Sequence, residues 1–250
     1  MSFSWINFFK CGAKTHRFQH AYQPIVNTKD KTIYGYESLL RGAENEHPSE
    51  VLGAVGRRRM VRFDQFNRAC SLERLAELGL STRVSLNFTS SCLVDSKADV
   101  ISETLEEAII LGFDPGQIIF EICESEVVHG VVGLREVLDR IRSAGALIVL
   151  DDFGAGFAGI NSLIDTDPDI LKLDRYMVSG IETSGIRQSA VKSIFSLTKS
   201  MGIELIAEGV ETEEEVNCLA DLGIHLFQGY FFAKPAVSEL TTPKGFNQSV

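Results

Sequence analysis

The sequence predicts an α/β fold, and three features of it support this class. Short apolar segments rich in β-formers alternate along the 250 residues with longer segments of helical periodicity. No linker rich in Pro, Gly or Ser interrupts the alternation, so one domain is expected. A glycine, whose left-handed backbone ends a helix at little cost, follows each of five expected helices: Gly79, Gly112, Gly145, Gly202 and Gly223.

The expected strands are the short apolar runs, and the expected helices are the longer periodic ones. The strands are residues 22–26, 32–39, 83–88, 117–122, 147–150, 170–173, 203–207 and 226–228. The helices are residues 51–78, 98–111, 134–144, 187–201 and 213–222. In the first helix the apolar residues recur at roughly helical spacing, at Val55, Phe63, Phe66, Ala69, Leu72 and Leu75.

Periodicity alone leaves an open doubly wound sheet and a closed (β/α)8 barrel as alternatives. Polar residues stand at or just past the ends of seven expected strands: Glu37, Asn87, Glu121, Asp151 with Asp152, Lys172 with Asp174, Glu208 and Gln228. Acidic side chains in apolar strands are costly unless they are paired or bind metal. A barrel brings these strand ends together on one face, whereas an open sheet spreads them along an edge. The polar residues therefore favour the barrel.

The residue types at these strand ends indicate a metal site. Carboxylates and an amide oxygen are hard ligands that suit Mg²⁺ or Mn²⁺. Adjacent Asp151 and Asp152 would allow one carboxylate to bridge two cations, an arrangement that recurs in phosphoryl transfer. Lys172 either balances the charge of Asp151 and Asp174, or holds or helps to deprotonate an attacking water, or stabilises charge on a phosphate. The five histidines form no HxxxH or HExxH pattern, which argues against zinc.

Composition narrows the function further. A formal net charge of −10 makes binding to a DNA or RNA polymer unfavourable. The five cysteines are scattered and form no CxxC pair, which fits a reducing, cytoplasmic location. No apolar run approaches the roughly 20 residues of a transmembrane helix. The aromatic N-terminus, residues 1–13, is expected to be a lightly packed end or, alternatively, a surface helix that touches a partner or membrane.

Nine short motifs resemble the signatures of one family in the same order, between about Phe18 and Leu240. They are residues 23–26, 36–41, 85–87, 121–125, 150–157, 171–174, 207–212, 228–230 and 234–235. Residues 36–41 (YESLLR) resemble the Glu-Ala-Leu signature of EAL domains, with Ser38 in place of alanine. A single tripeptide of this kind is weak support, but nine in register are specific. The chain therefore resembles the EAL-domain cyclic di-GMP phosphodiesterases.

This resemblance implies a modified (β/α)8 TIM-like barrel with one antiparallel strand, the first. It also implies metal-dependent hydrolysis of cyclic di-GMP to linear pGpG in bacterial second-messenger signalling, which controls biofilm formation and motility. Residues 18–250 would form the single catalytic domain, after a short N-terminal extension over residues 1–17. A homodimer and a regulatory partner protein are further expectations from the family.

The resemblance also implies roles for individual residues. Two Mg²⁺ or Mn²⁺ ions are expected in the site, the first bound by Glu37, Asn87, Glu121 and Asp151 and the second by Asp151, Asp152 and Glu208. The implied catalytic residues are Lys172, Glu208, Glu211 and Gln228. Those implied to contact the substrate are Gln23, Arg41, Asp174 and Pro235. Glu124 would anchor the loop after Asp152 from outside the metal site.

The chain departs from the family pattern in the loop after Asp152 and beside Glu121. Ala155, Phe157, Ala158 and Gly159 stand where family members often carry hydroxyl side chains, and Cys123 replaces a threonine. Each lost hydroxyl can remove a hydrogen bond worth about 0.5–1.5 kcal/mol. Weaker ordering of the loop would favour a second hypothesis, a non-catalytic cyclic di-GMP receptor. A third is a different Mg²⁺ barrel enzyme, such as an enolase-like proton abstractor.

Overall fold

The computed structural model of the chain describes residues 7–11, 14–89, 100–127, 133–156 and 159–248. Eight strands in this part close a barrel, because each of β2 to β9 pairs with the next and β9 pairs back with β2. The barrel strands are β2 (Lys14–Asn27), β3 (Thr32–Gly42), β4 (Arg83–Asn87), β5 (Ile118–Cys123), β6 (Leu147–Phe153), β7 (Ile170–Leu173), β8 (Glu204–Glu208) and β9 (Leu226–Gln228). The predicted barrel is thereby confirmed, and the open sheet is wrong.

Strand direction also follows the expectation. β2 runs antiparallel to both of its neighbours, β3 and β9. The six other pairings around the ring are parallel. Parallel strands bring their carboxyl ends to one mouth of the barrel, which is the end where the polar residues were expected.

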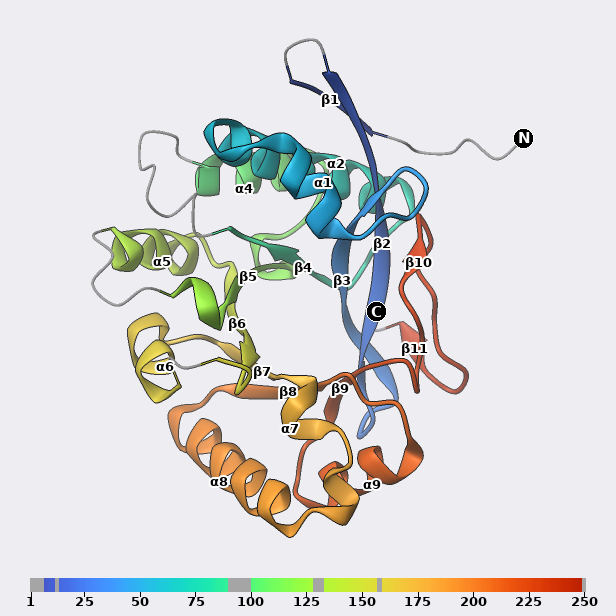
Figure 1. The fold of residues 1–250 in the computed structure, drawn as a ribbon, viewed down its shortest axis with the longest axis vertical. Helices are drawn as coiled ribbons and strands as arrows, with labels where there is room; N and C mark the ends of the chain where they lie inside the picture. The colour runs from blue at the N-terminus through green and yellow to red at the C-terminus, as the bar shows by residue number, and fades with distance from the viewer. Residues whose placement is uncertain (1–6, 12–13, 90–99, 128–132, 157–158, 249–250) are drawn as a thin grey trace.

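Helices cover most of the outer side of the ring of strands but not the side beside β2, as Figure 1 shows. They are α1 (Pro48–Val55), α2 (Met60–Glu77), α4 (Val100–Ile110), α5 (Leu134–Ser143), α6 (Ile160–Thr166), α7 (Arg175–Val178), α8 (Gly185–Met201) and α9 (Glu213–Asp221). Short 3-10 turns cover Arg57–Arg59, Pro115–Gln117, Glu124–Glu126 and Ile181–Thr183. None of the described helices is both long and apolar enough to cross a membrane.

The expected helix ends are confirmed, but one expected helix is wrong. All five glycines after the expected helices have positive φ, between 71° and 103°. The single helix expected over residues 51–78 is instead α1 and α2, separated by Gly56 with φ 76°. The sequence pattern did not reveal this break because the apolar spacing continues across it. The short helices α6 and α7 were not expected.

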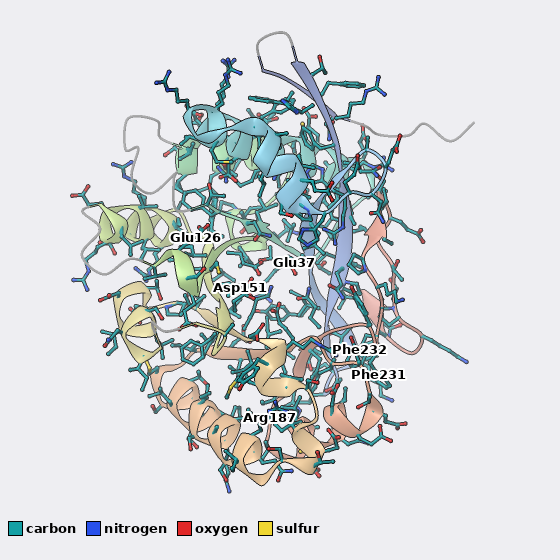
Figure 2. All side chains as sticks on the ribbon, in the orientation of Figure 1. Glu37, Glu126, Asp151, Arg187, Phe231 and Phe232 are labelled. Carbon is teal, nitrogen blue, oxygen red and sulfur yellow. The ribbon has the colours of Figure 1, made fainter. Side chains whose placement is uncertain are left out.

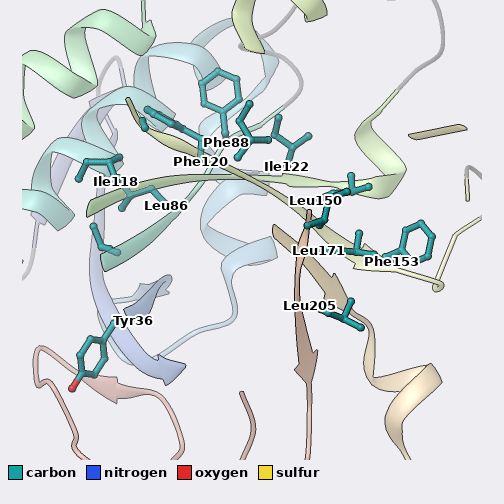
Figure 3. Close-up of a cluster of buried hydrophobic side chains, with 14 of the residues drawn as sticks. Tyr36, Leu86, Phe88, Ile118, Phe120, Ile122, Leu150, Phe153, Leu171 and Leu205 are labelled. Atoms are coloured by element: carbon teal, nitrogen blue, oxygen red, sulfur yellow. The ribbon is translucent and has the colours of Figure 1, made fainter. Parts of the chain in front are cut away.

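The main hydrophobic core lies between the barrel and its helices. Figure 3 shows part of this core, in which alternate strand residues such as Phe120, Leu150 and Leu171 project away from the barrel interior. Period-two alternation then directs the intervening residues into the barrel. The interior is therefore set by every second residue of each strand, and it carries the site.

The N-terminal residues that the structure describes form a strand. β1 (Asn7–Cys11) pairs antiparallel with the start of β2, so a surface helix over residues 7–11 is wrong. Phe9 is buried, and its ring lies 5.3 Å from that of Phe63 on α2. β2 spans both sides of the expected domain boundary at residue 18. Residues 1–6, 12 and 13 lie outside the described part of the chain. Two short strands, β10 (Ala236–Val237) and β11 (Asn247–Gln248), pair with β2 and β3.

Candidate active site

The barrel interior consists of two layers of side chains, one apolar and one polar. The apolar layer contains Ile25, Ile119, Val149, Ile170, Ile206 and Leu226. The polar layer stands two residues away on the same six strands, at Gln23, Glu121, Asp151, Lys172, Glu208 and Gln228. Residues two apart in a strand point to the same face, so both sets face the interior. β3 and β4 add Glu37 and Asn87, and Figure 2 places Glu37 and Asp151 inside the ring.

Lys172 is at the centre of the polar layer and is fully buried, at 0% exposure. Its ammonium Nζ lies 3.4 Å from Glu37 Oε2, 3.6 Å from Asp151 Oδ1 and 2.5 Å from Glu208 Oε1. It also forms a close ion pair with Glu121. One buried cation thus contacts four carboxylates that come from four strands. The residues expected at a common site are together.

Amide and hydroxyl groups of neighbouring side chains hold two of these carboxylates, Glu37 and Glu121. Gln228 Nε2 donates to Glu37 Oε2 at 2.6 Å and to Gln23 Oε1 at 3.1 Å. Asn87 Nδ2 is 3.5 Å from Glu37 Oε1. Ser85, two residues before Asn87 on β4, donates to Glu121. Glu37 and Glu121 are consequently held in place independently of Lys172.

Asp151 and Asp152 reach the same region because the backbone is irregular there. Successive residues of a regular strand point to opposite faces. Here the pairing of β6 with β7 shifts between Leu150 and Phe153, and Asp152 adopts φ 58°. The side-chain oxygens of Asp151, Asp152 and Glu208 lie within 4.8 Å of one another as a result. Left-handed backbone at a non-glycine residue is uncommon and is often found at functional sites.

The local charge balance perturbs the titration of these groups. Burial, together with repulsion from neighbouring carboxylates, raises the pKa of Glu121 and of Glu208 well above the ordinary 4.5. Burial and the nearby Asp151 also raise the pKa of Asp152 above 3.8. Burial opposes the charge of Lys172, but attraction to the surrounding carboxylates outweighs it and raises the pKa of Lys172 above 10.5. One lysine is too little positive charge for this many carboxylates.

The donor set fits hard divalent cations. The structure contains two overlapping groups of three carboxylates, Glu37, Glu121 and Glu208 in one and Asp151, Asp152 and Glu208 in the other. Asp151 Oδ1 is buried and accepts no hydrogen bond in the described part of the chain; the Lys172 ammonium lies 3.6 Å away, and a bound cation would satisfy this oxygen more fully. Oxygen-only ligands suit Mg²⁺ or Mn²⁺. Glu208 belongs to both groups, whereas the sequence assigned it to one.

The loop after Asp152 is anchored at both of its described ends by Glu124. This buried carboxylate accepts hydrogen bonds from the backbone N–H of Gly154 at 3.1 Å and of Gly159 at 2.5 Å. Ala155 is exposed, and Phe157 and Ala158 lie outside the described residues. The lost hydroxyls therefore leave this backbone anchor intact.

Cys123 contacts a carboxylate next to the polar layer, Asp152. Its thiol donates to Asp152 Oδ2 at 3.2 Å and lies 3.1 Å from Ser125 Oγ. Burial raises the pKa of this thiol to about 11, so it is protonated at neutral pH. A thiol is a weaker donor than the hydroxyl of the threonine expected from the family.

Two pockets open onto the polar layer, and both include Glu37. One, of about 280 Å³, contains Gln23, Glu208, Glu211 and Gln228. The other, of about 240 Å³, is lined by residues that include Asn87, Glu121 and Cys123. The polar layer is thus accessible to a ligand larger than water.

Some expected site residues lie at the rim or beyond it. Glu211 is 44% exposed, and its Oε2 pairs with Arg175 Nη2 at 2.8 Å. Asp174 caps α7 by accepting a hydrogen bond from the backbone N–H of Tyr176 at 2.8 Å. Arg41 donates a hydrogen bond to the backbone carbonyl of Leu40. In the part of the chain that the structure describes, neither pocket includes Arg41, Asp174 or Pro235.

Sequence reasoning missed four polar residues near the site: Ser85, Arg175, Asp64 and Asn67. Ser85 could have been found because it stands two residues before Asn87 and therefore faces the same side of β4. Arg175 follows Asp174 directly and supplies the only cation among the described residues of the first pocket. Asp64 and Asn67 of α2, which line the second pocket, were missed because α2 was treated only as a helix with an apolar face.

Comparison with known proteins agrees with this geometry. The EAL domain family matches residues 12–235, so the chain belongs to the EAL domain family. It is 33% identical over 218 residues to the blue light- and temperature-regulated antirepressor BluF of Escherichia coli, covering 86% of this chain. It is 30% identical over 234 residues, 90% of this chain, to the cyclic di-GMP phosphodiesterase RocR of Pseudomonas aeruginosa. The chain spans little more than half of these relatives, 53% of BluF and 59% of RocR.

Solved structures share the fold of this chain. Klebsiella pneumoniae BlrP1, in a calcium complex with cyclic di-GMP, superposes with a TM-score of 0.86 at 32% identity. The match covers 90% of this chain and 57% of that one. A manganese complex of BlrP1 with the same dinucleotide gives a TM-score of 0.84.

Proposed function

We propose that this chain is a metal-dependent phosphodiesterase that hydrolyses cyclic di-GMP to linear pGpG in bacterial second-messenger signalling. The observation that carries the proposal is the group of buried or half-buried carboxylates around Lys172 at the carboxyl mouth of the barrel. RocR is named as a cyclic di-GMP phosphodiesterase, and BlrP1 binds this dinucleotide with calcium or manganese. Both support the choice of substrate.

Two Mg²⁺ or Mn²⁺ ions would be held by the polar layer. Their ligands are Glu37, Asn87, Glu121, Asp151, Asp152 and Glu208. Bound there, the ions would polarise a phosphoryl oxygen and lower the pKa of a bound water. They would also supply positive charge for an anionic substrate that an acidic protein otherwise repels.

Lys172 acts in this proposal as a fixed cation. In the metal-free chain the surrounding carboxylates raise its pKa, so the ammonium is protonated there and donates hydrogen bonds. In the working site it would hold or help to deprotonate the attacking water, or stabilise charge on the phosphate. Such a preorganised donor stabilises a transition state without reorganisation.

The remaining polar residues orient the substrate and the site. Gln23 and Gln228 lie in the first pocket next to Glu37, and Glu211 lies at its rim. Arg41 would pair with a phosphate through its guanidinium group, and Asp174 and Pro235 would contact the rest of the dinucleotide. These contacts require the substrate to extend beyond the two pockets.

A cyclic di-GMP receptor without turnover is the second candidate. BluF, a relative at 33% identity, is named as an antirepressor, so family membership alone does not fix catalysis. The changed loop favours the receptor, whereas the complete carboxylate set and the Glu124 anchor favour the enzyme.

The test is to incubate the purified protein with cyclic di-GMP and Mg²⁺ or Mn²⁺ and to separate the products by chromatography. A parallel sample contains a chelator. Formation of pGpG only in the presence of metal supports the enzyme. Tight binding without product would establish the receptor, and neither binding nor product would refute both candidates.

A further inference from the structure

Helix α2 presents buried or half-buried polar side chains to three neighbouring strands of the barrel. Asn67 Oδ1 lies 2.8 Å from His20 Nε2 on β2. Ser71 Oγ lies 2.6 Å from Ser38 Oγ on β3. Arg68 reaches the end of β4. A helix that packs on a barrel usually does so with an apolar face, so these contacts need a reason other than burial of apolar surface.

Arg68 makes the largest number of these contacts. It is 1% exposed, and its guanidinium forms an ion pair with Asp64 one turn earlier on α2. Nε donates to Thr104 Oγ1 on α4 at 3.2 Å. The guanidinium carbon lies 5.0 Å from the centre of the Phe88 ring. Nη1 lies 3.5 Å from the backbone oxygen of Asn87. The planar guanidinium thus contacts two helices and the end of β4.

The two β4-end residues that Arg68 contacts are linked to the carboxylates of the site. Asn87 Nδ2 is directed at Glu37 Oε1 at 3.5 Å. The backbone N–H of Phe88 donates to the carbonyl of Glu121 at 2.9 Å. A shift of this segment would therefore move Asn87 directly and Glu121 through one hydrogen bond.

We infer that Arg68 is a positioning residue for the metal site, and that it acts through the backbone of Asn87 and the ring of Phe88. By holding the end of β4 in place, Arg68 sets the positions from which the Asn87 amide and the Glu121 carboxylate would bind a cation. This inference rests on the proposed function, since it assumes that these residues bind metal. Groups that orient metal ligands from outside typically change metal affinity 10–100-fold when they are altered.

Arginine suits this position better than lysine. One planar group can donate to a carboxylate at one edge, donate to another acceptor at a second edge and stack on an aromatic ring at the same time. A lysine ammonium can pair with Asp64, but it offers no planar face to Phe88. Arg68→Lys therefore keeps the buried charge pair and removes the contacts that lead to the metal site.

The experiment measures Mn²⁺ binding by isothermal titration calorimetry, without substrate, in the wild-type chain and in Arg68→Lys. Thermal unfolding of the metal-free proteins is followed in parallel. We expect Arg68→Lys to bind Mn²⁺ about tenfold more weakly or worse. A purely structural role would lower the unfolding temperature and leave the Mn²⁺ affinity of the folded protein unchanged.

Arg74→Lys is the matched control. Arg74 lies on the same helix and pairs with Glu77, while its Nη2 donates to Ser238 O rather than to β4. It should bind Mn²⁺ as the wild type does. If Arg68→Lys does not fold, Phe88→Leu removes the aromatic face at similar volume and should weaken Mn²⁺ binding severalfold.

The outcomes separate this inference from the proposed function. Mn²⁺ affinity that is unchanged in Arg68→Lys, or in Phe88→Leu where that variant replaces it, overturns the positioning role alone. Equal weakening in Arg74→Lys also overturns it, because the effect would then be general to α2. A wild-type chain that binds no Mn²⁺ overturns the proposed metal site and this inference with it.

Discussion

The two layers of the barrel interior come from the same strands and yet do different work. Ile170 and Lys172 both project inward from β7, and both are fully buried. Ile170 belongs to the cluster formed by the apolar layer, whereas Lys172 contacts four carboxylates. Within two residues of the same strand, the barrel interior therefore changes from packed apolar side chains to charged ones.

This difference shows how the fold tolerates its costly residues. The side chains of the apolar layer pack together inside the barrel, and the burial of each one stabilises the fold. The ion pairs of the polar layer contribute little to the stability of the fold, because the cost of desolvating the charges offsets their attraction. We therefore expect changes in the polar layer, the upper of the two, to affect metal binding and turnover. Changes in the apolar layer, the lower of the two, should affect stability.

The largest effect is expected for Glu37→Ala in the upper layer. The change removes a carboxylate that contacts Lys172, Gln228 and Asn87, but little core volume. Turnover of cyclic di-GMP should fall below detection while the thermal unfolding transition remains cooperative. Glu106→Ala, at an exposed position on α4, serves as control. Full activity in Glu37→Ala would contradict the role of the upper layer.

Lys172→Ala should lower kcat about 10²–10³-fold, the usual effect of removing a preorganised charge donor. Affinity for cyclic di-GMP in the presence of Ca²⁺ should fall much less. Steady-state kinetics and equilibrium binding separate the two quantities. Equal losses in both would make Lys172 a binding residue only.

Ile170→Ala probes the lower layer on the same strand. Removing this buried side chain should reduce the free energy of unfolding by about 2–5 kcal/mol, through lost burial and a residual cavity. Turnover per folded molecule should not change, which is the reverse of the result for Lys172. Denaturant titration and kinetics on the same sample check both. A loss of turnover without a loss of stability would break the distinction between the layers.

The pH dependence of Mn²⁺ binding tests whether the polar layer carries more negative charge than Lys172 can balance. Glu121 and Glu208 hold protons more tightly in the folded, metal-free chain than in the unfolded chain. The metal-free protein should therefore lose stability as pH rises above 4.5. Metal must displace these protons, so Mn²⁺ affinity should increase with pH over the same window. Calorimetry in buffers of different ionisation enthalpy counts the released protons, and a count of zero contradicts this account.

The smallest effect is expected for Ser38→Ala, which restores alanine to the family signature. Ser38 donates to or accepts from Ser71 on α2, and both side chains are buried. The loss of this bond should cost about 0.5–1.5 kcal/mol of stability, with turnover little changed because Glu37 is kept. Denaturant titration measures the first quantity. A large loss of turnover would show that β3 needs this link to hold Glu37.

The sequence allowed much of the barrel to be predicted because its signals are local. Apolar runs placed all eight barrel strands, and polar residues at their ends indicated the common mouth. β2 proved longer than residues 22–26, since its first half pairs with β1 and β3 and is partly polar. Strand periodicity alone does not reveal such an extension.

The fine geometry of the site depends on contacts distant in sequence. The left-handed backbone at Asp152 could not be predicted, because aspartate adopts it only where the surrounding structure imposes it. The pairing of Glu211 with Arg175 depends on how α7 approaches β8. The contacts of Arg68 with β4 depend on the packing of α2, which a helical pattern does not specify.

Crystals grown with Mn²⁺ would show whether the polar layer holds divalent metal. Anomalous scattering locates manganese independently of any assumption about the site. We predict peaks bound by Glu37 and Glu121 on one side and by Asp151 and Asp152 on the other, with Glu208 near both. A map with no peak in the barrel mouth, from crystals that contain Mn²⁺ elsewhere, would contradict this prediction.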